Sequence, residues 1–232
     1  MKIIIDPEGN KIFWKKGDLH TSFGVVKEDK IKNGIVETHL GKNLVIFDAH
    51  FVDLLERIER GPAIMNKKDI GTILSYTGIN NKSKIVDAGT GCGILAACLG
   101  NISKNVVSYE RRKDFYELAQ RNLKFLGVKI KLKQKDIFEG IDEKNLDLIT
   151  LDLLEPWKVV KHAQRNLKSG GFLVSYLTNI NQVSQLVDNL DGFYVEKVLE
   201  TIERGWVVDG VKVRPEHQGL LHTGFLVFAR RI

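Results

Sequence analysis

The stretch Ile85-Val-Asp-Ala-Gly-Thr-Gly-Cys-Gly93 decides the fold of this 232-residue chain. The run Lys84–Ala88 is short and mostly apolar with an acid near its end, as in a buried parallel strand. Three glycines then alternate with small residues, and Ile94–Leu99 has the composition of a following helix. Glycine lets a ligand approach bare backbone, and a helix start presents unpaired N–H groups. The stretch therefore predicts a nucleotide-type binding site at the carboxyl end of a sheet.

The glycine spacing indicates which nucleotide binds. Gly89, Gly91 and Gly93 do not fit the Gly-x-Gly-x-x-Gly pattern of dinucleotide sites. The pattern Asp-x-Gly-x-Gly-x-Gly resembles motif I of the Rossmann-like methyltransferases, which bind S-adenosylmethionine. The next apolar run ends at Glu110, 23 residues after Asp87, where a carboxylate can accept both ribose hydroxyls. The alternative is a glycine-rich turn with an ordinary strand-end glutamate, but two signals at this separation favour a ligand.

Composition and charge narrow the class of protein. No apolar run approaches the roughly 20 residues that span a bilayer, and the amino terminus does not resemble a signal peptide. We therefore expect a cytoplasmic protein with no membrane contact. The net charge of +6 is compatible with a polyanionic partner. Cys92 and Cys98 suit small-residue packing, and the histidines lack metal-ligand spacing, so no metal site is expected.

Four lysines alternate along one predicted strand. Lys129, Lys131, Lys133 and Lys135 would all project from the same face of that strand. Such a row can hold nucleic-acid phosphates, or it can be solubilising charge on the surface.

The first part of the chain predicts a small β domain with a connecting helix, residues 1–62. Its strand-like runs are separated by turn residues and suggest a small barrel or sandwich. They are Lys2–Ile5, Lys11–Trp14, Phe23–Lys27, Ile35–Thr38 and Leu44–Phe47. His50–Arg60 carries apolar residues on one helical face, and Gly61-Pro62 ends this helix. Residues 63–232 then form the predicted catalytic domain.

In the second part strands and helices alternate, which predicts a doubly wound, mostly parallel sheet. After a helix at 67–76, the expected elements are strand 84–88, helix 92–100, strand 105–110, helix 112–126, strands 128–134 and 146–152, helix 156–168, strand 171–177 and helix 181–190. Phe193–Ile202, Trp206–Val213 and Leu220–Ala229 are strand-like with no helix between them. They predict antiparallel C-terminal strands at one edge of the sheet.

Two further acids follow predicted strands. Asp136 lies after the third strand, where the methyltransferase pattern has an acid that binds the adenine amino group and an apolar neighbour that packs on the ring. Asp152 ends the fourth strand and would aim a carboxylate at whatever lies beside the methyl donor. The alternatives are a polar strand end for Asp136 and a helix cap for Asp152. Their register behind Asp87 and Glu110 favours the cofactor role and the catalytic role.

The sequence Asp152-Leu-Leu-Glu-Pro-Trp157, together with Val174–Val183, resembles the tRNA (adenine-N1) methyltransferases. That family modifies adenine 58 in the T-loop, and its archaeal members also modify adenine 57. The resemblance extends to Asp18-Leu-His-Thr21, to Lys68-Asp69 and to His222-Thr-Gly-Phe-Leu226. It implies a class I S-adenosylmethionine-dependent methyltransferase fold with a small N-terminal β module, a tRNA substrate and a homotetramer.

The same resemblance implies the site residues. Asp152 would contact the target adenine and Tyr176 would line its pocket as the catalytic pair. The implied cofactor contacts are Asp87, Gly89, Thr90, Gly91, Gly93, Glu110, Arg111, Asp136, Ile137 and Asp152. Two departures bear on this assignment: Asn66-Lys67 replaces a common Tyr-Pro, and Thr178 replaces a common proline.

Two other functions are compatible with the fold. A catalytically silent tRNA-binding subunit would show decay at the glycine turn or at Asp152, and both are intact. A methyltransferase for proteins or small molecules would share the cofactor residues, and only the identity of the methyl acceptor separates it from a tRNA enzyme.

Overall fold

The computed structural model describes residues 1–61, 64–217, 219 and 221–232. The chain divides into two compact units, Met1–Arg57 and Ile58–Ile232, and each is described by itself. The boundary expected between residues 62 and 63, and the helix stop at Pro62, fall on residues outside this description. The domain limits therefore stay a prediction.

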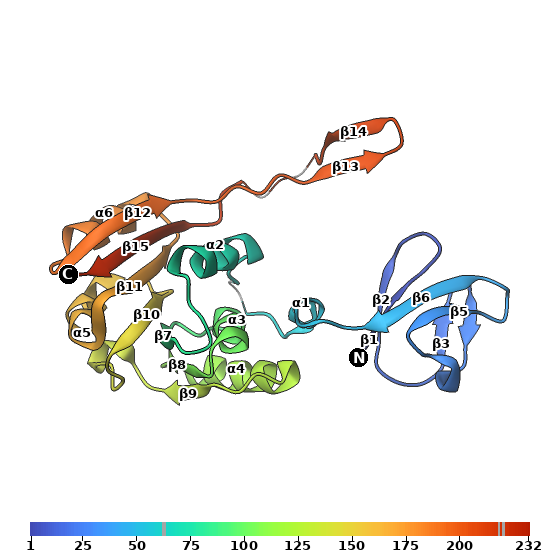
Figure 1. Cartoon of the computed structure of the whole chain (residues 1–232), viewed down its shortest axis with the longest axis horizontal. Helices are drawn as coiled ribbons and strands as arrows, with labels where there is room; N and C mark the ends of the chain where they lie inside the picture. Colours follow the sequence, from blue (N-terminus) through green and yellow to red (C-terminus); the bar gives the residue numbers. More distant parts are fainter. Residues whose placement is uncertain (62–63, 218, 220) are drawn as a thin grey trace. The chain divides into compact units, whose positions relative to one another are not determined.

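The first unit is built on a four-stranded antiparallel sheet with the order β2-β1-β6-β5 (Figure 1). These strands are β1 (Lys2–Ile5), β2 (Lys11–Trp14), β5 (Gly34–Glu37) and β6 (Asn43–Asp48). A separate pair, β3 (Leu19–Thr21) and β4 (Gly24–Val26), supplies Leu19 and Val26 to the core on one sheet face. The short strand β3 was not expected from the sequence. The 3-10 turn η1 (Glu28–Lys30) follows β4.

The helix expected at residues 50–60 is much shorter in the structure. One turn of α-helix, α1 (Phe51–Leu54), passes into the 3-10 turn η2 (Leu55–Arg57). The Asp53 carboxylate accepts a hydrogen bond from His50 N at 2.9 Å and so caps this turn. The helix ends early although Leu55 and Ile58 of the expected apolar face are buried, so the sequence indicated which side chains are buried but not the length of the helix.

The second unit contains a seven-stranded sheet with the order β12-β15-β11-β10-β7-β8-β9. The strands are β7 (Lys84–Ala88), β8 (Asn105–Glu110), β9 (Lys131–Gln134), β10 (Leu146–Leu151), β11 (Leu167–Leu177), β12 (Phe193–Leu199) and β15 (Phe225–Arg231). The five strands from β9 to β11 are parallel, and β15 runs antiparallel to both of its neighbours. The expected doubly wound, mostly parallel sheet with an antiparallel C-terminal finish is confirmed.

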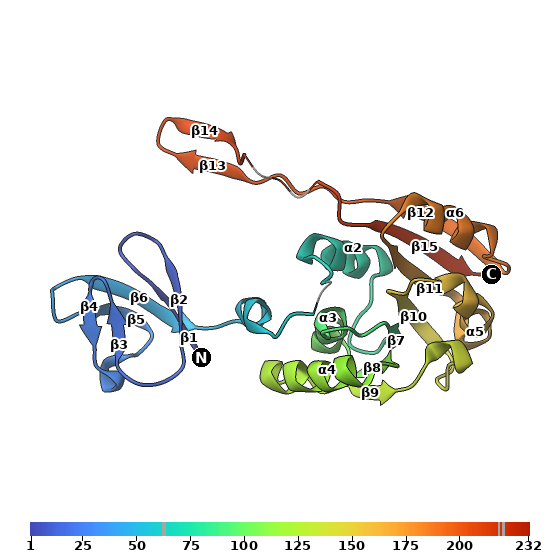
Figure 2. The same ribbon diagram turned by 180° about the vertical axis from the view of Figure 1, so that it is seen from behind.

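Helices cover both faces of this sheet (Figures 1 and 2). On one face lie α2 (Lys67–Thr77), α3 (Ile94–Ile102) and α4 (Lys113–Leu126), and on the other lie α5 (Val160–Asn166) and α6 (Ile180–Asp188). The helix expected at 156–168 is divided into the 3-10 turn η4 (Pro156–Val159) and α5. The core includes Ile149 and Leu173 of the central strands with Val160 and Leu186 of the covering helices.

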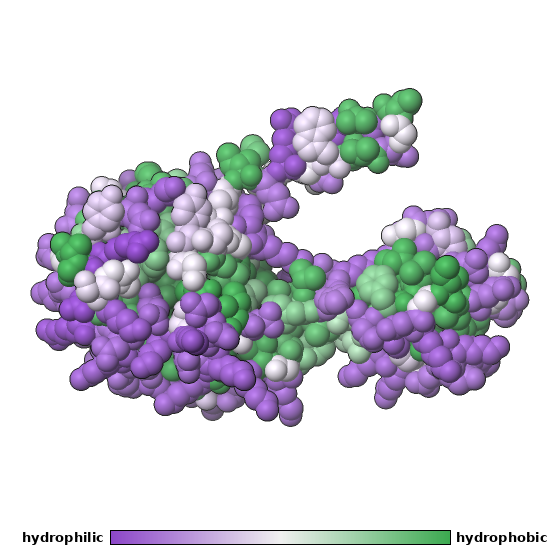
Figure 3. Space-filling view, viewed as in Figure 1, coloured by the Kyte–Doolittle hydropathy of each residue, from purple (hydrophilic) through white to green (hydrophobic). Residues whose placement is uncertain are grey.

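One C-terminal prediction was wrong. The run 206–213 does not join the sheet: it forms the hairpin of β13 (Trp206–Asp209) and β14 (Lys212–Pro215), with Val208 opposite Val213. The apolar residues of this hairpin, Trp206, Val208, Val211 and Val213, are exposed (Figure 3). Gly210 has a φ of 54° and forms the turn between β13 and β14, so the single strand expected over Trp206–Val213 is interrupted there. The predicted start of the last strand, Leu220, lies outside the described residues.

Two further observations concern the described part of the chain alone. None of its helices has the length and apolar character needed to cross a membrane. Within the same residues no three His, Cys, Asp or Glu side chains come together as metal ligands.

Cys92 and Cys98 are free and buried, and burial raises the pKa of the Cys98 thiol to about 11.

Candidate active site

The glycine turn after β7 is fixed by its contact with the end of β10. Gly89, Gly91 and Gly93 have φ values of 84°, 55° and 86°, a region that side chains with a Cβ atom disfavour. A Cβ atom on Gly89 would lie 2.1 Å from the backbone oxygen of Asp152. Asp152 N in turn donates a hydrogen bond to Ala88 O at 2.9 Å. The turn and Asp152 are therefore held together through the backbone.

Asp87 lies inside the sheet and not on the surface of the site. Its two carboxylate oxygens accept hydrogen bonds from Ser108 Oγ at 2.6 Å and Thr150 Oγ1 at 2.7 Å, on the two neighbouring strands. Thr90 Oγ1 extends this chain of hydroxyls to Ser108 at 2.6 Å. Burial raises the pKa of the Asp87 carboxyl, although both hydroxyls favour its charged form. Asp87 therefore braces the strand ends that carry the turn.

Glu110 ends β8 beside the glycine turn. Its carboxylate oxygens accept hydrogen bonds from Gly91 N at 3.0 Å and from Arg112 N at 2.9 Å. Each carboxylate oxygen offers about two acceptor positions, so one position on each oxygen remains for a ligand. The same side chain thus shapes the turn and can accept a pair of hydroxyl groups.

A cavity of about 420 Å³ opens between these strand ends. Most of the sequence-predicted cofactor residues line it: Gly89, Gly91, Glu110, Arg111, Asp136, Ile137 and Asp152. Of the other expected site residues, Asp87, Thr90, Gly93 and Tyr176 are not among the described residues that line this cavity. Additional lining residues that the sequence did not indicate are Tyr109, Arg112, Phe115, Lys135, Phe138, Leu153, Leu154 and Glu155.

Asp136 and Phe138 form one wall of the cavity. Asp136 precedes the 3-10 turn η3 (Ile137–Glu139) and accepts a hydrogen bond from Phe138 N at 2.9 Å. Arg111 reaches the second carboxylate oxygen of Asp136 at 3.3 Å and lies 5.9 Å from the centre of the Phe138 ring. An acceptor beside apolar and aromatic side chains is suited to a heteroaromatic ring that carries an amino group.

Asp152 is an acid of the cavity lining whose pKa is strongly raised. The surrounding protein desolvates its carboxyl and, with a smaller contribution from the charge of Asp87, raises its pKa to about 7. Its side chain is nevertheless open to the cavity, so water reaches the carboxyl when the cavity holds no ligand. A carboxyl that lines a cavity and titrates near neutral pH is a candidate for acid–base or electrostatic catalysis.

Tyr176 lies on β11 and is half-buried. Its hydroxyl donates a hydrogen bond to Thr223 O at 2.7 Å. Burial raises the pKa of the phenol, and the charges of Asp69 and Asp152 add to the rise. The phenol is therefore within electrostatic reach of Asp152, although it does not line the cavity.

The lysine row is only partly available to an external anion. Lys133 contacts Asp142 at 2.8 Å and Glu143 at 2.5 Å, and Lys135 contacts Asp142 at 2.7 Å. The two lysines hold the pKa of Asp142 down at about 2. The loop after η3 brings these acids onto the strand, so Lys133 and Lys135 are paired within the protein, and phosphate binding by the row stays a prediction.

These features together fit one ligand class. A glycine turn gives close access to backbone, Glu110 can accept two hydroxyls, and Asp136 with Ile137 and Phe138 suits an amino-bearing ring. Asp152 also lines the cavity, so a reacting group bound there can meet its carboxyl. The donor and acceptor set fits an adenosine-based cofactor whose reactive end meets Asp152.

Comparison with known proteins extends this assignment. The protein-L-isoaspartate(D-aspartate) O-methyltransferase (PCMT) family model matches residues 18–207. TrmI of Methanocaldococcus jannaschii, a tRNA (adenine(57)-N(1)/adenine(58)-N(1))-methyltransferase, is 32% identical, over 99% of this chain and 94% of the relative. This chain belongs to the TrmI family of tRNA (adenine-N1)-methyltransferases, within the PCMT-like enzymes. Its class as an S-adenosylmethionine-dependent methyltransferase is thereby confirmed.

Other relatives agree with this family. A tRNA (adenine(58)-N(1))-methyltransferase TrmI of Thermus thermophilus is 33% identical, over 95% of this chain and 91% of the relative. The crystal structure of the tRNA (m1A58) methyltransferase TrmI of Aquifex aeolicus superimposes with a TM-score of 0.85 at 25% identity, covering 100% of this chain and 96% of that one. An S-adenosylmethionine-dependent O-methyltransferase of Thermotoga maritima gives 0.87 at 26% identity, covering 100% and 92%. The fold class predicted from the sequence is confirmed.

Proposed function

We propose that this chain transfers a methyl group from S-adenosylmethionine to N1 of adenine 58 in the T-loop of tRNA. The observation that supports it most strongly is the match to the tRNA enzyme of M. jannaschii over 99% of the chain, both units included. Adenine 58 is the position that all three quoted TrmI relatives share, and among them adenine 57 is named for the M. jannaschii enzyme alone.

The cofactor assignment follows from the cavity. S-adenosylmethionine, when bound, supplies an electrophilic methyl group. Gly89 and Gly91 would give its polar end access to the backbone, and Glu110 would accept its ribose hydroxyls. Asp136 would accept a hydrogen bond from the adenine amino group, with Ile137 and Arg111 beside the ring. In this assignment Asp87, Thr90 and Gly93 act on the cofactor indirectly, since they hold the turn and do not line the cavity.

Asp152 would act on the target base. N1 of adenine has its own lone pair, so its methylation needs no strong base to create a nucleophile. Methylation leaves the base cationic, and a carboxylate that accepts a hydrogen bond from the N6 amino group stabilises the developing charge. Alignment of N1 with the methyl group supplies the rest of the acceleration. Because N1 is hidden in folded tRNA, the base must first leave its stack.

The charge distribution supports a polyanionic substrate held by the second unit. Residues 1–57 contain nine basic and nine acidic residues, so the net charge of +6 belongs entirely to residues 58–232. Phosphate binding would therefore come chiefly from the unit that contains the cavity.

We further propose a homotetramer, which light scattering of the purified protein tests directly.

The deciding experiment identifies the product. Unmodified tRNA transcript is incubated with enzyme and radiolabelled S-adenosylmethionine. Complete digestion to nucleosides identifies the methylated product, and mass spectrometry of the oligonucleotides from a partial digest gives its position. We expect 1-methyladenosine at position 58, and loss of the product when that adenine is replaced by guanine. Methyl incorporation elsewhere in the tRNA, or none at all, contradicts the proposal.

The PCMT family match supports a second candidate, methylation of isoaspartyl carboxylates in proteins. A protein-L-isoaspartate O-methyltransferase of Nitrosomonas europaea is 28% identical over 73% of this chain. An isoaspartyl peptide placed in the same assay separates the two candidates, since its methyl ester is labile to base and 1-methyladenosine in tRNA keeps its label.

A further inference from the structure

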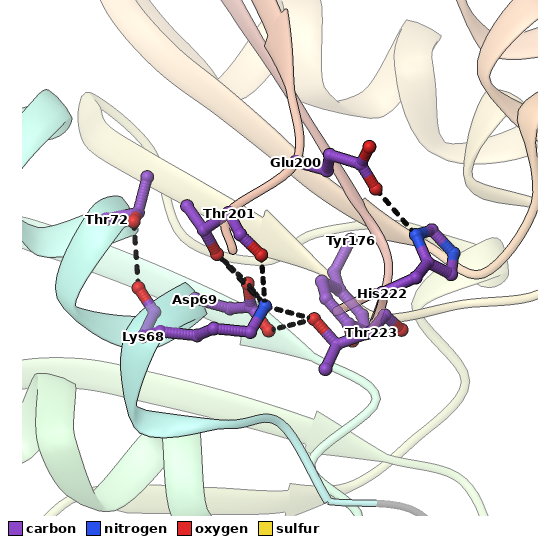
Figure 4. A network of polar contacts seen from close by, with 8 residues as sticks. All are labelled: Lys68, Asp69, Thr72, Tyr176, Glu200, Thr201, His222 and Thr223. Carbon is purple, nitrogen blue, oxygen red and sulfur yellow. Dashed lines mark hydrogen bonds and ion pairs between the residues drawn. The ribbon is translucent and has the colours of Figure 1, made fainter. Parts of the chain in front are cut away.

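A buried ion pair at the start of α2 joins three distant segments of the second unit (Figure 4). Lys68 Nζ lies 2.9 Å from Asp69 Oδ1, 2.7 Å from Thr201 O, 3.1 Å from Thr201 Oγ1 and 2.5 Å from Thr223 Oγ1. The hydroxyls of Thr201 and Thr223 donate to the two Asp69 oxygens at 2.5 and 2.7 Å. The Lys68 side chain is 8% exposed and that of Asp69 is fully buried. Both charged groups of the pair are thus hydrogen-bonded within the protein.

The two threonines lie at the two ends of the segment that connects β12 to β15. Thr201 follows β12 and Thr223 precedes β15, and the hairpin β13–β14 lies between them in sequence. Glu200 and His222, their immediate neighbours, form a second link at 2.7 Å, in which both side chains are partly exposed. The ion pair therefore holds both ends of this connecting segment against α2.

Thr223 also connects the ion pair to Tyr176. Its side chain contacts Lys68 and Asp69, while its backbone oxygen accepts the hydrogen bond from the Tyr176 hydroxyl at 2.7 Å. The next residue, Gly224, passes so close to the Tyr176 ring that a Cβ atom would lie 2.5 Å from Cζ. The position of Thr223 therefore sets the position of the Tyr176 phenol, whose ring has no free space on this side.

We propose that Lys68, Asp69 and Thr223 are positioning residues that set Tyr176 for its action on the methyl acceptor. This inference rests on the proposed function, because it gives Tyr176 a role in the transfer to adenine. None of the three is among the described residues that line the cavity, so they would act through the Thr223 backbone. The cofactor half of the cavity, with Glu110 and Asp136, lies outside their contacts.

The energetics of buried ion pairs are consistent with a positioning role. Removing two charges from water costs several kcal/mol each, and apolar replacements are often as stable as the pair. Such a pair therefore contributes little net stability. Its five short contacts to Thr201 and Thr223 fix one arrangement of segments that are more than 130 residues from Lys68 in sequence.

Thr223→Val gives the most selective test. It removes the hydroxyl from the ion pair but keeps side-chain shape and the carbonyl that binds Tyr176. We expect turnover on tRNA to fall by about 10- to 100-fold, the effect of a misplaced reacting group, with unchanged affinity for S-adenosylmethionine. Thr223→Ser, which keeps the hydroxyl, should restore turnover. Thr77→Val is the matched control, since it removes a hydroxyl bonded to Ile73 O at the other end of α2.

A double-mutant cycle separates positioning from general damage. If Thr223 acts through Tyr176, then in a Tyr176→Phe background Thr223→Val should cost less than about twofold in turnover. Fully additive losses overturn the proposal. If Thr223→Val does not fold, Thr201→Val removes the other hydroxyl of the network and is judged by the same criteria.

A signal independent of activity completes the test. The protein contains five tyrosines, and labelling them with 13C at Cζ lets the Tyr176 resonance be assigned through Tyr176→Phe. We expect Thr223→Val and Asp69→Asn to shift this resonance and leave the other four unchanged. An unmoved Tyr176 resonance overturns the inference even if the enzyme methylates adenine. If the wild-type protein leaves tRNA unmethylated, the proposed function fails, and a shifted resonance still supports the positioning of Tyr176.

Discussion

The backbone oxygen of Asp152 occupies the space that a side chain on Gly89 would need. A Cβ atom on Gly89 would lie 2.1 Å from that oxygen, and the φ of Gly89 is 84°. The first glycine of the turn and the candidate catalytic acid are therefore one structural unit, because neither strand end can move without the other.

Gly89→Ala should be much more damaging than Gly91→Ala. Both positions have left-handed backbone, which costs an alanine about 1–2 kcal/mol. Only Gly89 adds a backbone clash, whereas the nearest atom to a Cβ on Gly91 is 3.8 Å away. Denaturant unfolding and calorimetric titration with S-adenosylmethionine measure the two effects. Equal losses of stability and affinity at both positions would show that the contact with Asp152 is not the constraint.

Glu110→Ala should weaken S-adenosylmethionine binding by more than about 1 kcal/mol, the scale of charge-assisted hydrogen bonds. The variant loses the acceptor for two hydroxyls and also the bonds from Gly91 N and Arg112 N that shape the turn. Glu117→Ala is the control: it removes an exposed carboxylate on α4 that lies 3.9 Å from Lys113. Unchanged affinity in folded Glu110→Ala would remove this residue from the cofactor site.

Asp152→Ala should lower turnover by about 10²–10⁴, the range for a positioned acid–base group. The glycine turn and Glu110 stay intact, so the affinity for S-adenosylmethionine should hardly change. Asp152→Asn distinguishes charge from orientation, because its amide still accepts a hydrogen bond but has no charge. Full methylation of tRNA by the alanine variant would exclude a catalytic role.

The raised pKa of Asp152 predicts a pH dependence of turnover. If the carboxylate is the active form, kcat/KM should rise as the pH passes through about 7. In Asp152→Asn this limb of the profile should be absent. A wild-type profile that is flat between pH values of about 5 and 8 would mean that Asp152 does not titrate in the active enzyme.

The same pKa predicts a change in stability. A carboxyl whose pKa is raised on folding stabilises the native state below its unfolded pKa, and this contribution is lost as the pH rises through the folded value of about 7. Asp152→Asn should therefore gain thermal stability relative to wild type at a pH of about 8, and show less gain at about 5. Melting temperatures measured at both pH values check the sign.

The lysine row should divide into two functional pairs. Lys129 and Lys131 are exposed, so replacing both with glutamine should lower the salt dependence of tRNA binding by about two units of slope. Replacing Lys133 and Lys135 should change the slope less and lower stability, since it leaves Asp142 and Glu143 without their cations. Equal slopes in the two double variants would contradict this division.

Local sequence predicted most elements of the second unit. The strands Lys84–Ala88 and Asn105–Glu110 have the predicted limits, because each is an apolar run bounded by polar or glycine residues. Predictions failed where local signals were weak. Trp206–Val213 has strand composition throughout but folds into a hairpin, and His50–Arg60 has an apolar helical face but forms only one α-helical turn followed by a 3-10 turn.

The sequence by itself determined the parallel sheet, the glycine turn and the acids at successive strand ends, because periodicity and strand-end position are local properties of the chain. Only the tertiary structure decided which of these acids face the cavity. Asp87 is enclosed by Ser108 and Thr150 from neighbouring strands, whereas Glu110 and Asp152 line the cavity. The Lys68–Asp69 network likewise depends on Thr201 and Thr223, which no spacing in the sequence connects with α2. Such contacts arise only when strand order and loop paths bring distant residues together, and no local pattern encodes them.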